Sequence, residues 1–529
     1  MSPPPAEGAY ADLVTASHFS FLRGASHPGD MVARALALGH AGIGIADRNS
    51  VAGVVRAYVA LRDANRELAR EGLPPVDFKL AVGARLVFAD GTPDIVAYPE
   101  DRRGWGRLTR LLSTGNLRAV KGDCILHFAD LIAHVDGLLL IVLPQSSAVP
   151  QQPHPAPTVA LPELNDDAPA DLAGTLARLA VAAPGRVWLG LDMPRAGDDA
   201  RRLARHARIA QAAGVPIVAT TDALFAAPAD RPLQDVLTAI REGVTVAAAG
   251  RRLAANAERH LKSEREMRRL FRSQPQAVDE AARLLARIGF SLDQLRYDYP
   301  HEPVPEGWDA QGWLEHIAWH AALDRWQDHV PPQAIAMLHE EFALIRKQRY
   351  AHYFLTVHDI VRFARAQSPP ILCQGRGSAA NSIVCFLLGV TSVDPMKYDL
   401  LFSRFVSEER DEPPDIDVDF EHERREEVMQ YIYARYGRHR AGIAATVIHF
   451  RPRSAVREVG KALGFTEDVT NRLVSTVWGS FAGKMEEARF IDAGFDLANP
   501  QMARLRGLID RILNFPRHLS KHVGGFVLT

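Results

Sequence analysis

The chain has 529 residues and a formal net charge of -1, with 62 lysines and arginines against 63 aspartates and glutamates. Apolar residues make up 47% and charged residues 24%, which excludes disorder, collagen and coiled coil for the chain as a whole. The balanced charge also excludes a globally basic nucleic-acid binder, so any contact with DNA or RNA must use local basic patches. The length predicts about three or four domains.

Compartment and redox state follow from a few local features. The three cysteines, Cys124, Cys373 and Cys385, form no CxxC pair, so we expect reduced thiols and neither a disulfide framework nor a cysteine zinc site. Residues 1–10 are rich in proline and alanine and lack the apolar core of a signal peptide. No apolar run reaches membrane-spanning length. We therefore expect a cytoplasmic protein without membrane contact.

In the first 220 residues, short apolar runs alternate with amphipathic stretches. This alternation predicts a parallel sheet or barrel with right-handed crossovers. Residues 145–171 are rich in Pro, Gln and Asp and predict a long surface loop inside this first domain. We expect strands at 41–46, 80–88, 137–143, 186–191 and 215–220, and helices at 51–61 and 200–214.

Helices dominate the rest of the chain. Residues 230–295 are helical and charged in pattern and predict a join to a second domain. Residues 338–366 predict two amphipathic helices with 350–354 between them, and Pro369 and Pro370 end the second. A further helix is expected at 379–388, and residues 447–515 are expected to be mostly helical.

The segment PDIDVDF, residues 414–420, alternates acidic and apolar residues. On a strand, Asp415, Asp417 and Asp419 share one face, spaced by roughly 6.6 Å, while the apolar residues point into a core. Such carboxylates repel one another and need cations to stay ionised together. Two hard metal ions held in this way are the usual apparatus of phosphoryl or nucleotidyl transfer. The alternatives are a solvated strand face or a calcium loop, although the loop glycine is absent.

The element Gly375-Arg376-Gly377-Ser378 follows a short apolar piece and is expected to open a helix. Glycines let the backbone approach a phosphate, the free amides of a helix N-terminus favour anions, and Ser378 and Arg376 add a donor and a cation. It is not a Walker loop, and the alternative is a tight turn with a serine cap. A phosphate cradle followed by an acidic strand is the order found in nucleotidyltransferases that resemble polymerase beta.

Further cations lie near these motifs in sequence. Arg404 precedes the acidic strand, and Arg453, Arg457 and Lys461 are spaced to form one stripe on a helix. The stripe suits a triphosphate or a DNA backbone, with a solvated helix face as the alternative.

The motifs QGRGSAANS (374–382), LLFSRF (400–405) and PDIDVDF (414–420) together resemble the palm of bacterial family C DNA polymerases, the polymerase III alpha subunits. Four more segments resemble the error-prone, DNA-damage-response branch of that family. They are FSFLRGASHP (19–28), DRNSVAGVVRA (47–57), RPLQDVL (231–237) and RPRSAVREVGK (451–461). The resemblance extends over essentially the whole chain.

The resemblance implies an α/β multidomain protein. Its parts are a PHP (polymerase and histidinol phosphatase) domain at 1–285, which is a distorted α/β barrel, a polymerase-beta-like nucleotidyltransferase palm at 286–446, a helical thumb at 447–515, and the start of a return to the palm at 516–529. It implies Asp415 and Asp417 as catalytic ligands of two Mg²⁺ ions. Asp419 is not counted among the family's catalytic aspartates.

The nucleotide site implied by the resemblance contains the cradle and several cations. Its residues are Arg376, Gly377, Ser378, Arg404, Arg453 and Arg457.

The PHP domain departs from the family's metal-binding pattern. The expected His-x-His pair is replaced by Val14 and Ala16, and other ligand positions hold Arg48, Arg85 and Leu224. Only Asp47 and Asp222 remain, and two carboxylates cannot build a multinuclear metal site. We therefore expect a scaffold without metal or phosphoesterase activity, and we expect His18 and His27 to be surface or capping residues.

The implied reaction is the DNA-directed addition of deoxynucleotides to a primer 3′ end in damage-induced mutagenesis and translesion synthesis. The partners would be primer–template DNA and deoxynucleoside triphosphates, with a sliding clamp and damage-response proteins binding through a missing C-terminal half. The resemblance places the third catalytic aspartate beyond Thr529, so we expect a fragment that does not polymerise DNA alone. The alternatives are a replicative alpha subunit, a disfavoured PHP phosphoesterase, and a non-catalytic DNA- or partner-binding module.

Overall fold

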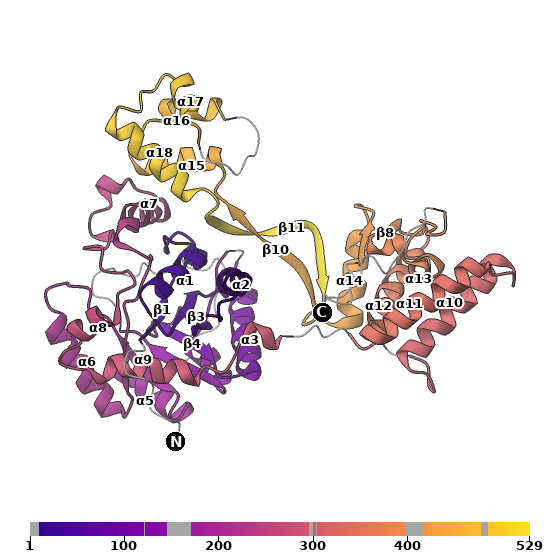
Figure 1. Ribbon diagram of the computed structural model, residues 1–529, viewed down its shortest axis with the longest axis horizontal. Helices are drawn as coiled ribbons and strands as arrows, with labels where there is room; N and C mark the ends of the chain where they lie inside the picture. Colours follow the sequence, from indigo (N-terminus) through magenta and orange to yellow (C-terminus); the bar gives the residue numbers. More distant parts are fainter. Residues whose placement is uncertain are drawn as a thin grey trace. The chain divides into compact units, whose positions relative to one another are not determined.

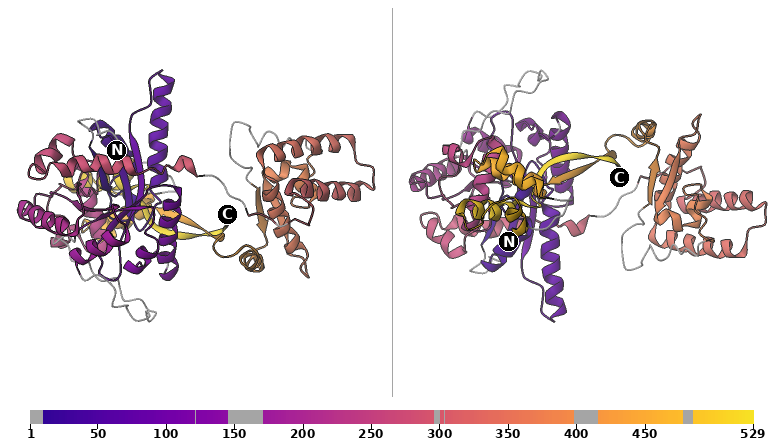
Figure 2. Two further views of the ribbon diagram at one scale, coloured as in Figure 1. Left: turned by 90° about the horizontal axis from the view of Figure 1, so that it is seen from below. Right: turned by 90° about the horizontal axis from the view of Figure 1, so that it is seen from above.

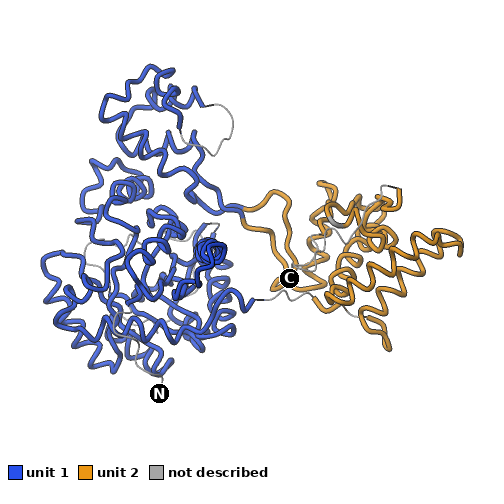
Figure 3. Tube along the Cα trace, viewed as in Figure 1, with its two compact units in different colours: residues 1–295, 446–520 blue, residues 296–445, 521–529 orange. Residues whose placement is uncertain are grey.

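The computed structural model describes residues 10–120, 122–144, 171–295, 300–302, 304–397, 416–477 and 485–529. The chain divides into two compact units, each built from two separate segments (Figure 3). Unit 1 contains residues 1–295 and 446–520, and unit 2 contains residues 296–445 and 521–529. The expected loop at 145–171 lies, apart from its last residue, outside the described residues.

Unit 1 is built on a seven-stranded sheet whose order follows the sequence (Figure 1). Hydrogen bonds from Ala16 N to Ala223 O (2.9 Å) and from Ala223 N to Val14 O (3.1 Å) join the first strand to the chain just after the last, so the sheet curves towards closure. The strands are β1 (Ala11–Thr15), β2 (Gly42–Arg48), β3 (Lys79–Leu86), β4 (Ile95–Pro99), β5 (Leu138–Val142), β6 (Val187–Leu191) and β7 (Ile217–Ala219).

The expected strands at 41–46, 80–88, 137–143, 186–191 and 215–220 correspond to β2, β3, β5, β6 and β7, and those predictions are confirmed. The sheet is not wholly parallel, however, because β4 pairs antiparallel with both β3 and β5. Neither β1 nor β4 was expected from the sequence. Every residue of β4 is buried, as it is in the predicted strands β5 and β6.

Helices cover this sheet on its outside. Their apolar faces complete a core of aliphatic strand residues such as Leu140 and Ile141. The helices are α1 (Pro28–Ala37), α2 (Val54–Arg70), α3 (Arg102–Arg118), α4 (Phe128–Ala133), α5 (Leu172–Ala182), α6 (Asp199–Ala213), α7 (Arg231–Glu242), α8 (Glu264–Leu270) and α9 (Gln276–Arg287).

The second segment of unit 1 is helical, as expected for 447–515, and it packs on α7. Val236 and Leu237 of α7 share a buried cluster with Val459 and Ile509, and Arg511 donates to Asp230 at 2.6 Å. The four helices are α15 (Pro452–Ala462), α16 (Glu467–Ser475), α17 (Glu487–Asp492) and α18 (Pro500–Ile512).

Unit 2 combines helices with a small two-stranded sheet, which is visible from two further directions in Figure 2. Two amphipathic helices were expected within 338–366, with 350–354 between them. The chain instead leaves the first of these helices at Arg349, which is in the left-handed region (φ 60°), and the second begins at Ala351. The elements are α10 (Ala310–Trp326), α11 (Pro332–Gln348), α12 (Ala351–Arg365), β8 (Cys373–Gly377), the 3-10 helix η6 (Ser378–Asn381), α13 (Ile383–Leu387), β9 (Ile416–Phe420) and α14 (Arg425–Tyr436).

A two-stranded ribbon, β10 (Ala441–His449) and β11 (Pro516–Leu528), contributes residues to both units. Phe450 N donates to Phe515 O at one end of the ribbon, and Thr529 N donates to Arg440 O at the other, so the two strands run antiparallel. None of the described helices is long and apolar enough to cross a bilayer.

Candidate functional site

The acidic strand and the glycine cradle are neighbours in one sheet. β9 pairs antiparallel with β8, which places Asp417 opposite Arg376 and Asp419 opposite Gln374. The two motifs are separated in sequence, and no local pattern encodes which strands pair, so sequence alone did not establish this pairing. Cations and carboxylates are therefore presented from adjacent strands.

The alternation predicted for PDIDVDF is confirmed over residues 416–420. Ile416 is buried and Val418 packs beside the same cluster as Ile383 and Val384, whereas Asp417 and Asp419 are exposed. Asp415 lies outside the described residues. The apolar side of β9 thus anchors the strand on α13 and leaves its acidic side open to a ligand.

Arg376 and Asp419 form an ion pair on this open side. Both side chains keep more than half of their surface exposed, at 70% and 55%. Since opposed residues on antiparallel strands share a face, Asp417 projects from the same side as this pair. The described residues of this face thus offer one guanidinium and two carboxylates.

A side chain could not be accommodated at either glycine of the cradle without a clash or backbone strain. A Cβ on Gly375 would lie 2.8 Å from Val390 O, to which Gly375 N donates at 2.7 Å. Gly377 has φ 59° and ψ -127°, a conformation open essentially to glycine alone. As expected, the element lies at the end of a short strand, β8, but a short 3-10 helix follows it before α13 begins.

Glu341 of α11 supports the segment after the cradle and was not expected from the sequence. Its buried carboxylate accepts hydrogen bonds from Ser382 Oγ (3.0 Å), Ile383 N (2.9 Å) and Val384 N (3.0 Å). Burial raises the pKa of Glu341 to about 7, although the three donors lower it. The sequence could have predicted that Glu341 is buried, because it lies on the apolar stripe formed by Leu338, Phe342 and Ile345.

The remaining predicted nucleotide-site residues lie either outside the described residues or in the other compact unit. Arg404 and the Ser378 side chain lie outside them. Arg453 and Arg457 share α15 with Lys461, as the spacing predicted, but α15 belongs to unit 1, whereas β8 and β9 belong to unit 2. Arg453 donates to Val477 O at 3.1 Å, and Arg457 is exposed.

Ion pairs and apolar residues occupy the strand ends of unit 1 where the family's metal ligands would lie. Arg85 donates to Asp94 and to Asp222, both at 2.7 Å, and Arg259 also pairs with Asp222. Val14, Ala16 and Leu224 are buried apolar residues. The Asp222 carboxylate is therefore engaged by guanidinium groups.

Asp47, the other surviving carboxylate, is held by backbone and hydroxyl donors. Its oxygens accept from Ser17 N (2.7 Å), Ser17 Oγ (2.8 Å) and Ser20 Oγ (2.7 Å). Burial raises the pKa of Asp47 to about 6. The carboxylate thus serves as an internal anchor for the loop after β1.

His18 is neither a surface nor a capping residue, so that prediction was wrong. It is 4% exposed, its Nε2 lies 2.7 Å from His27 Nδ1, and its ring packs on Phe515. Burial, together with the nearby His27, lowers the pKa of His18 to about 2. The residue is thus a neutral packing element beneath the helices of residues 446–520.

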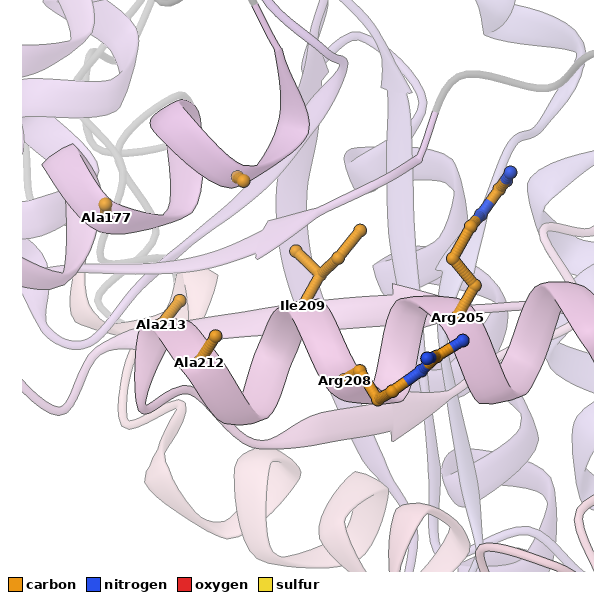
Figure 4. A pocket seen from close by; sticks show the side chains of 7 residues that line it. Ala177, Arg205, Arg208, Ile209, Ala212 and Ala213 are labelled. Atoms are coloured by element: carbon orange, nitrogen blue, oxygen red, sulfur yellow. The ribbon is translucent and has the colours of Figure 1, made fainter.

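A cavity of about 570 Å³ opens between α5 and α6 (Figure 4). Alanines and Ile209 line one part of it, and Arg205 and Arg208 extend from α6 at the other. No carboxylate, histidine or cysteine is among its lining residues, so it offers no metal ligand.

The chemistry of the β8–β9 face suits a hard divalent cation. Carboxylate oxygens are the protein ligands that Mg²⁺ uses, and it completes its octahedron with water and substrate phosphates. Asp417 and Asp419 both present such oxygens on this face, and Asp419 also pairs with Arg376. Within the described ranges no group of three or more His, Cys, Asp or Glu side chains could hold a metal. The described part therefore supplies only a portion of a ligand set.

Comparison with known proteins supports this interpretation of both regions. A family model described as the bacterial DNA polymerase III alpha NTPase domain matches residues 312–529, and a PHP domain model matches residues 12–167. The first match contains β8, β9 and Glu341. The second contains β1 to β5 of the sheet in unit 1.

Several curated relatives carry the name error-prone DNA polymerase. Those from Rhodopseudomonas palustris (strain BisB5), Bradyrhizobium sp. (strain ORS 278) and Brucella abortus biovar 1 (strain 9-941) are 54%, 53% and 52% identical, respectively, over 98% of this chain. The chain spans less than half of their length, at 44%, 42% and 46%. Residues 312–529 therefore match the bacterial DNA polymerase III alpha family, and the chain is similar over nearly its whole length to relatives named error-prone DNA polymerase.

Proposed function

We propose that the chain provides the nucleotidyl-transfer centre of an error-prone DNA-directed DNA polymerase. Its substrates would be primer–template DNA and deoxynucleoside triphosphates, and its role would be translesion synthesis in damage-induced mutagenesis. The observation that carries the proposal is the pairing of β8 with β9, which sets Asp417 opposite Arg376.

The proposed roles follow from the chemistry of each side chain. Asp415 and Asp417 would hold Mg²⁺, and Arg376, Gly377, Ser378 and Arg404 would surround the triphosphate. Magnesium, when bound, supplies activation of the primer hydroxyl and neutralisation of the triphosphate charge. The backbone at Gly377 lets a phosphate approach closely, because no Cβ blocks it.

Asp419 has a different role in this proposal. It forms an exposed ion pair with Arg376, which an incoming phosphate would have to displace. We assign it as a positioning residue that holds Arg376 on the open face until a phosphate takes its place. This agrees with the family pattern, in which Asp419 is not counted among the catalytic aspartates.

The domain roles complete the proposal. Residues 1–285 would be the PHP scaffold, 286–446 the palm, 447–515 the thumb and 516–529 the return to the palm. Arg453 and Arg457 would then contact a triphosphate or the DNA backbone from the thumb. A sliding clamp and damage-response proteins would bind outside this chain, and the compartment would be the cytoplasm.

The test is Mg²⁺-dependent binding of a fluorescent deoxynucleoside triphosphate to the 529-residue chain. Asp417→Asn should weaken binding about tenfold or more, because a charge-assisted metal contact is lost. Asp123→Asn, an exposed change in unit 1, is the matched control. Equal binding by wild type and Asp417→Asn would contradict the proposal.

Primer extension with magnesium tests the expectation that this chain alone does not polymerise DNA. We expect no templated extension by the 529-residue chain. Extension that persists in Asp417→Asn would remove Asp417 from the catalytic set.

A further inference from the structure

Two histidines lie one turn apart on α10, on the side of the helix that faces away from the core of unit 2. The buried residues of α10 are Leu314, Ala318 and Ala322, which recur every four residues. His316 and His320 are each displaced from this stripe by two residues, which correspond to about 200° around a helix. The two histidines therefore project from the opposite side of α10, where His316 is half-buried and His320 is exposed. We call them the histidine pair.

The two imidazole rings of the histidine pair are already close together. Their centres are 4.3 Å apart, and the rings are inclined to each other by 72°. Two imidazole nitrogens bound to one metal ion at about 2.0–2.1 Å, with an angle of about 90° between them, would place the ring centres about 4.5 Å apart. The observed spacing therefore matches two ligands in neighbouring positions of a square-planar or octahedral ion.

The ring nitrogens of the histidine pair are not engaged by other groups of the described residues. Neither His316 nor His320 forms a hydrogen bond or an ion pair there, whereas the ring of His329, shortly after α10, is hydrogen-bonded to Gln327 O at 2.8 Å. A neutral imidazole has one nitrogen with a lone pair that can bind a metal. Both rings of the pair therefore keep that lone pair available.

Aromatic side chains hold the first ring of the pair in place. His316 stacks on Trp313, with ring centres 5.4 Å apart and an angle of 25°, and it also packs against Trp308 at 4.6 Å. Trp308 contacts Trp313 edge-on at 5.7 Å, and its backbone N donates to Pro305 O at 3.1 Å. A ring that is already held in this way loses less conformational entropy when it binds a ligand.

The charges along this side of α10 favour a cation. Asp324 lies one turn beyond His320 on the same stripe, and within the described ranges it forms no ion pair. The other acidic residue of α10, Glu315, is paired with Arg346 at 2.6 Å. In the described part of the chain no third His, Cys, Asp or Glu joins the histidine pair as a ligand, so water would fill the remaining coordination positions.

We infer that His316 and His320 together form a binding site for a late first-row transition-metal dication, the class that contains Ni²⁺, Cu²⁺ and Zn²⁺. Neutral imidazole suits these ions, whereas Mg²⁺ prefers oxygen ligands. The bound metal bridges two successive turns of α10 and so stabilises the helix. Cu²⁺ binds most tightly of the three, as the usual order of affinities requires. This inference is independent of the polymerase proposal, because its ligands lie on α10 and not on β8 or β9.

The experiment is a fluorescence titration of the untagged 529-residue chain with nickel chloride, in excess magnesium chloride. Ni²⁺ quenches a nearby indole, and Trp308 lies 4.6 Å from His316, so binding should lower the tryptophan emission saturably. His316→Gln and His320→Gln should each weaken binding by at least about tenfold, because even the loss of a group that only supports a metal ligand costs about 10–100-fold. His329→Gln, an exposed change in the same unit, is the matched control and should bind like wild type.

Thermal unfolding provides a second measurement of the same site. Ni²⁺ should raise the unfolding temperature of wild type and of His329→Gln more than that of His320→Gln, because a ligand stabilises only the folded state that binds it. His320 is exposed, so His320→Gln should fold like wild type in the absence of metal. The absence of saturable quenching, or quenching and thermal stabilisation of His320→Gln equal to those of wild type, would overturn the inference.

Discussion

Arg376 and Asp419 form an ion pair diagonally across β8 and β9, while Asp417 stands directly opposite Arg376 in the register. The guanidinium therefore has two carboxylates on its own face of the sheet. In the proposed reaction, a cation held by Asp417 and a phosphate near Arg376 would both enter this small charged surface. Because the two aspartates stand differently toward Arg376, the positioning role proposed for Asp419 can be tested separately from the metal-binding role proposed for Asp417.

The Asp419→Asn change should separate positioning from metal binding. Exposed ion pairs contribute about 0–1 kcal/mol, so the free energy of unfolding in urea should change by less than about 1 kcal/mol. Nucleotide binding should weaken less than in Asp417→Asn, and the dependence on magnesium concentration should stay unchanged. A change in the magnesium dependence as large as that of Asp417→Asn would instead make Asp419 a ligand.

From the raised pKa of Glu341 we expect unit 2 to become less stable as the pH rises. Its pKa is raised from 4.5 to about 7, so the folded state binds the proton more tightly than the unfolded state. The free energy of unfolding should therefore fall by about 3 kcal/mol between about pH 4.5 and 7. Thermal unfolding across this range measures the slope. Glu341→Gln should flatten the pH dependence of unfolding, and Glu306→Gln, an exposed change in the same unit, should leave it as in wild type.

From the lowered pKa of His18 we expect unit 1 to become less stable as the pH falls. Its pKa is lowered from 6.5 to about 2, so the folded state resists protonation and loses stability as the pH falls below 6.5. At pH 5 the loss should be about 2 kcal/mol relative to neutral pH. His18→Gln should unfold with a weaker acid dependence, whereas His320→Gln, exposed on α10, should retain the full dependence. An unchanged acid slope in His18→Gln would contradict the burial argument.

Arg85→Gln should destabilise unit 1 strongly. The change leaves Asp94 and Asp222 largely buried with one guanidinium fewer, and losing one partner of a buried ion pair costs about 3 kcal/mol. Urea unfolding measures the effect. Arg107→Gln is the control, because Arg107 is exposed and lies 3.6 Å from Asp136, and its loss should cost less than about 0.5 kcal/mol.

Much of the fold was predictable because its strands and helices have clear periodicity. The alternation of Asp417, Val418 and Asp419 predicted that the two aspartates share the exposed face of β9. The spacing of Arg453 and Arg457 predicted that both lie on one side of α15. β4 was missed although it is buried throughout like β5 and β6, which were predicted from their apolar runs. The antiparallel placement of β4 depends on contacts between distant residues that no local pattern encodes.

The candidate site was predictable in its residue types but not in its assembly. The register that sets Asp417 against Arg376 depends on how the two strands meet, and a shift by one residue would have turned the carboxylates to the other face. Glu341 is 41 residues before Ser382, and its role emerges only when α11 packs against α13. A charged residue on an apolar helical stripe was the available clue.

The ribbon of β10 and β11 has a practical consequence for protein engineering. Each compact unit is assembled from two stretches of polypeptide, so a single cut after residue 295 would divide unit 1 and leave its residues 446–520 on the same fragment as unit 2. The antiparallel strands place residues 445 and 521 close together where the chain passes from one unit to the other. Deleting residues 446–520 and joining residue 445 to residue 521 by a short hairpin turn would therefore yield unit 2, residues 296–445 and 521–529, as one uninterrupted polypeptide that retains Arg376, Asp417 and Glu341.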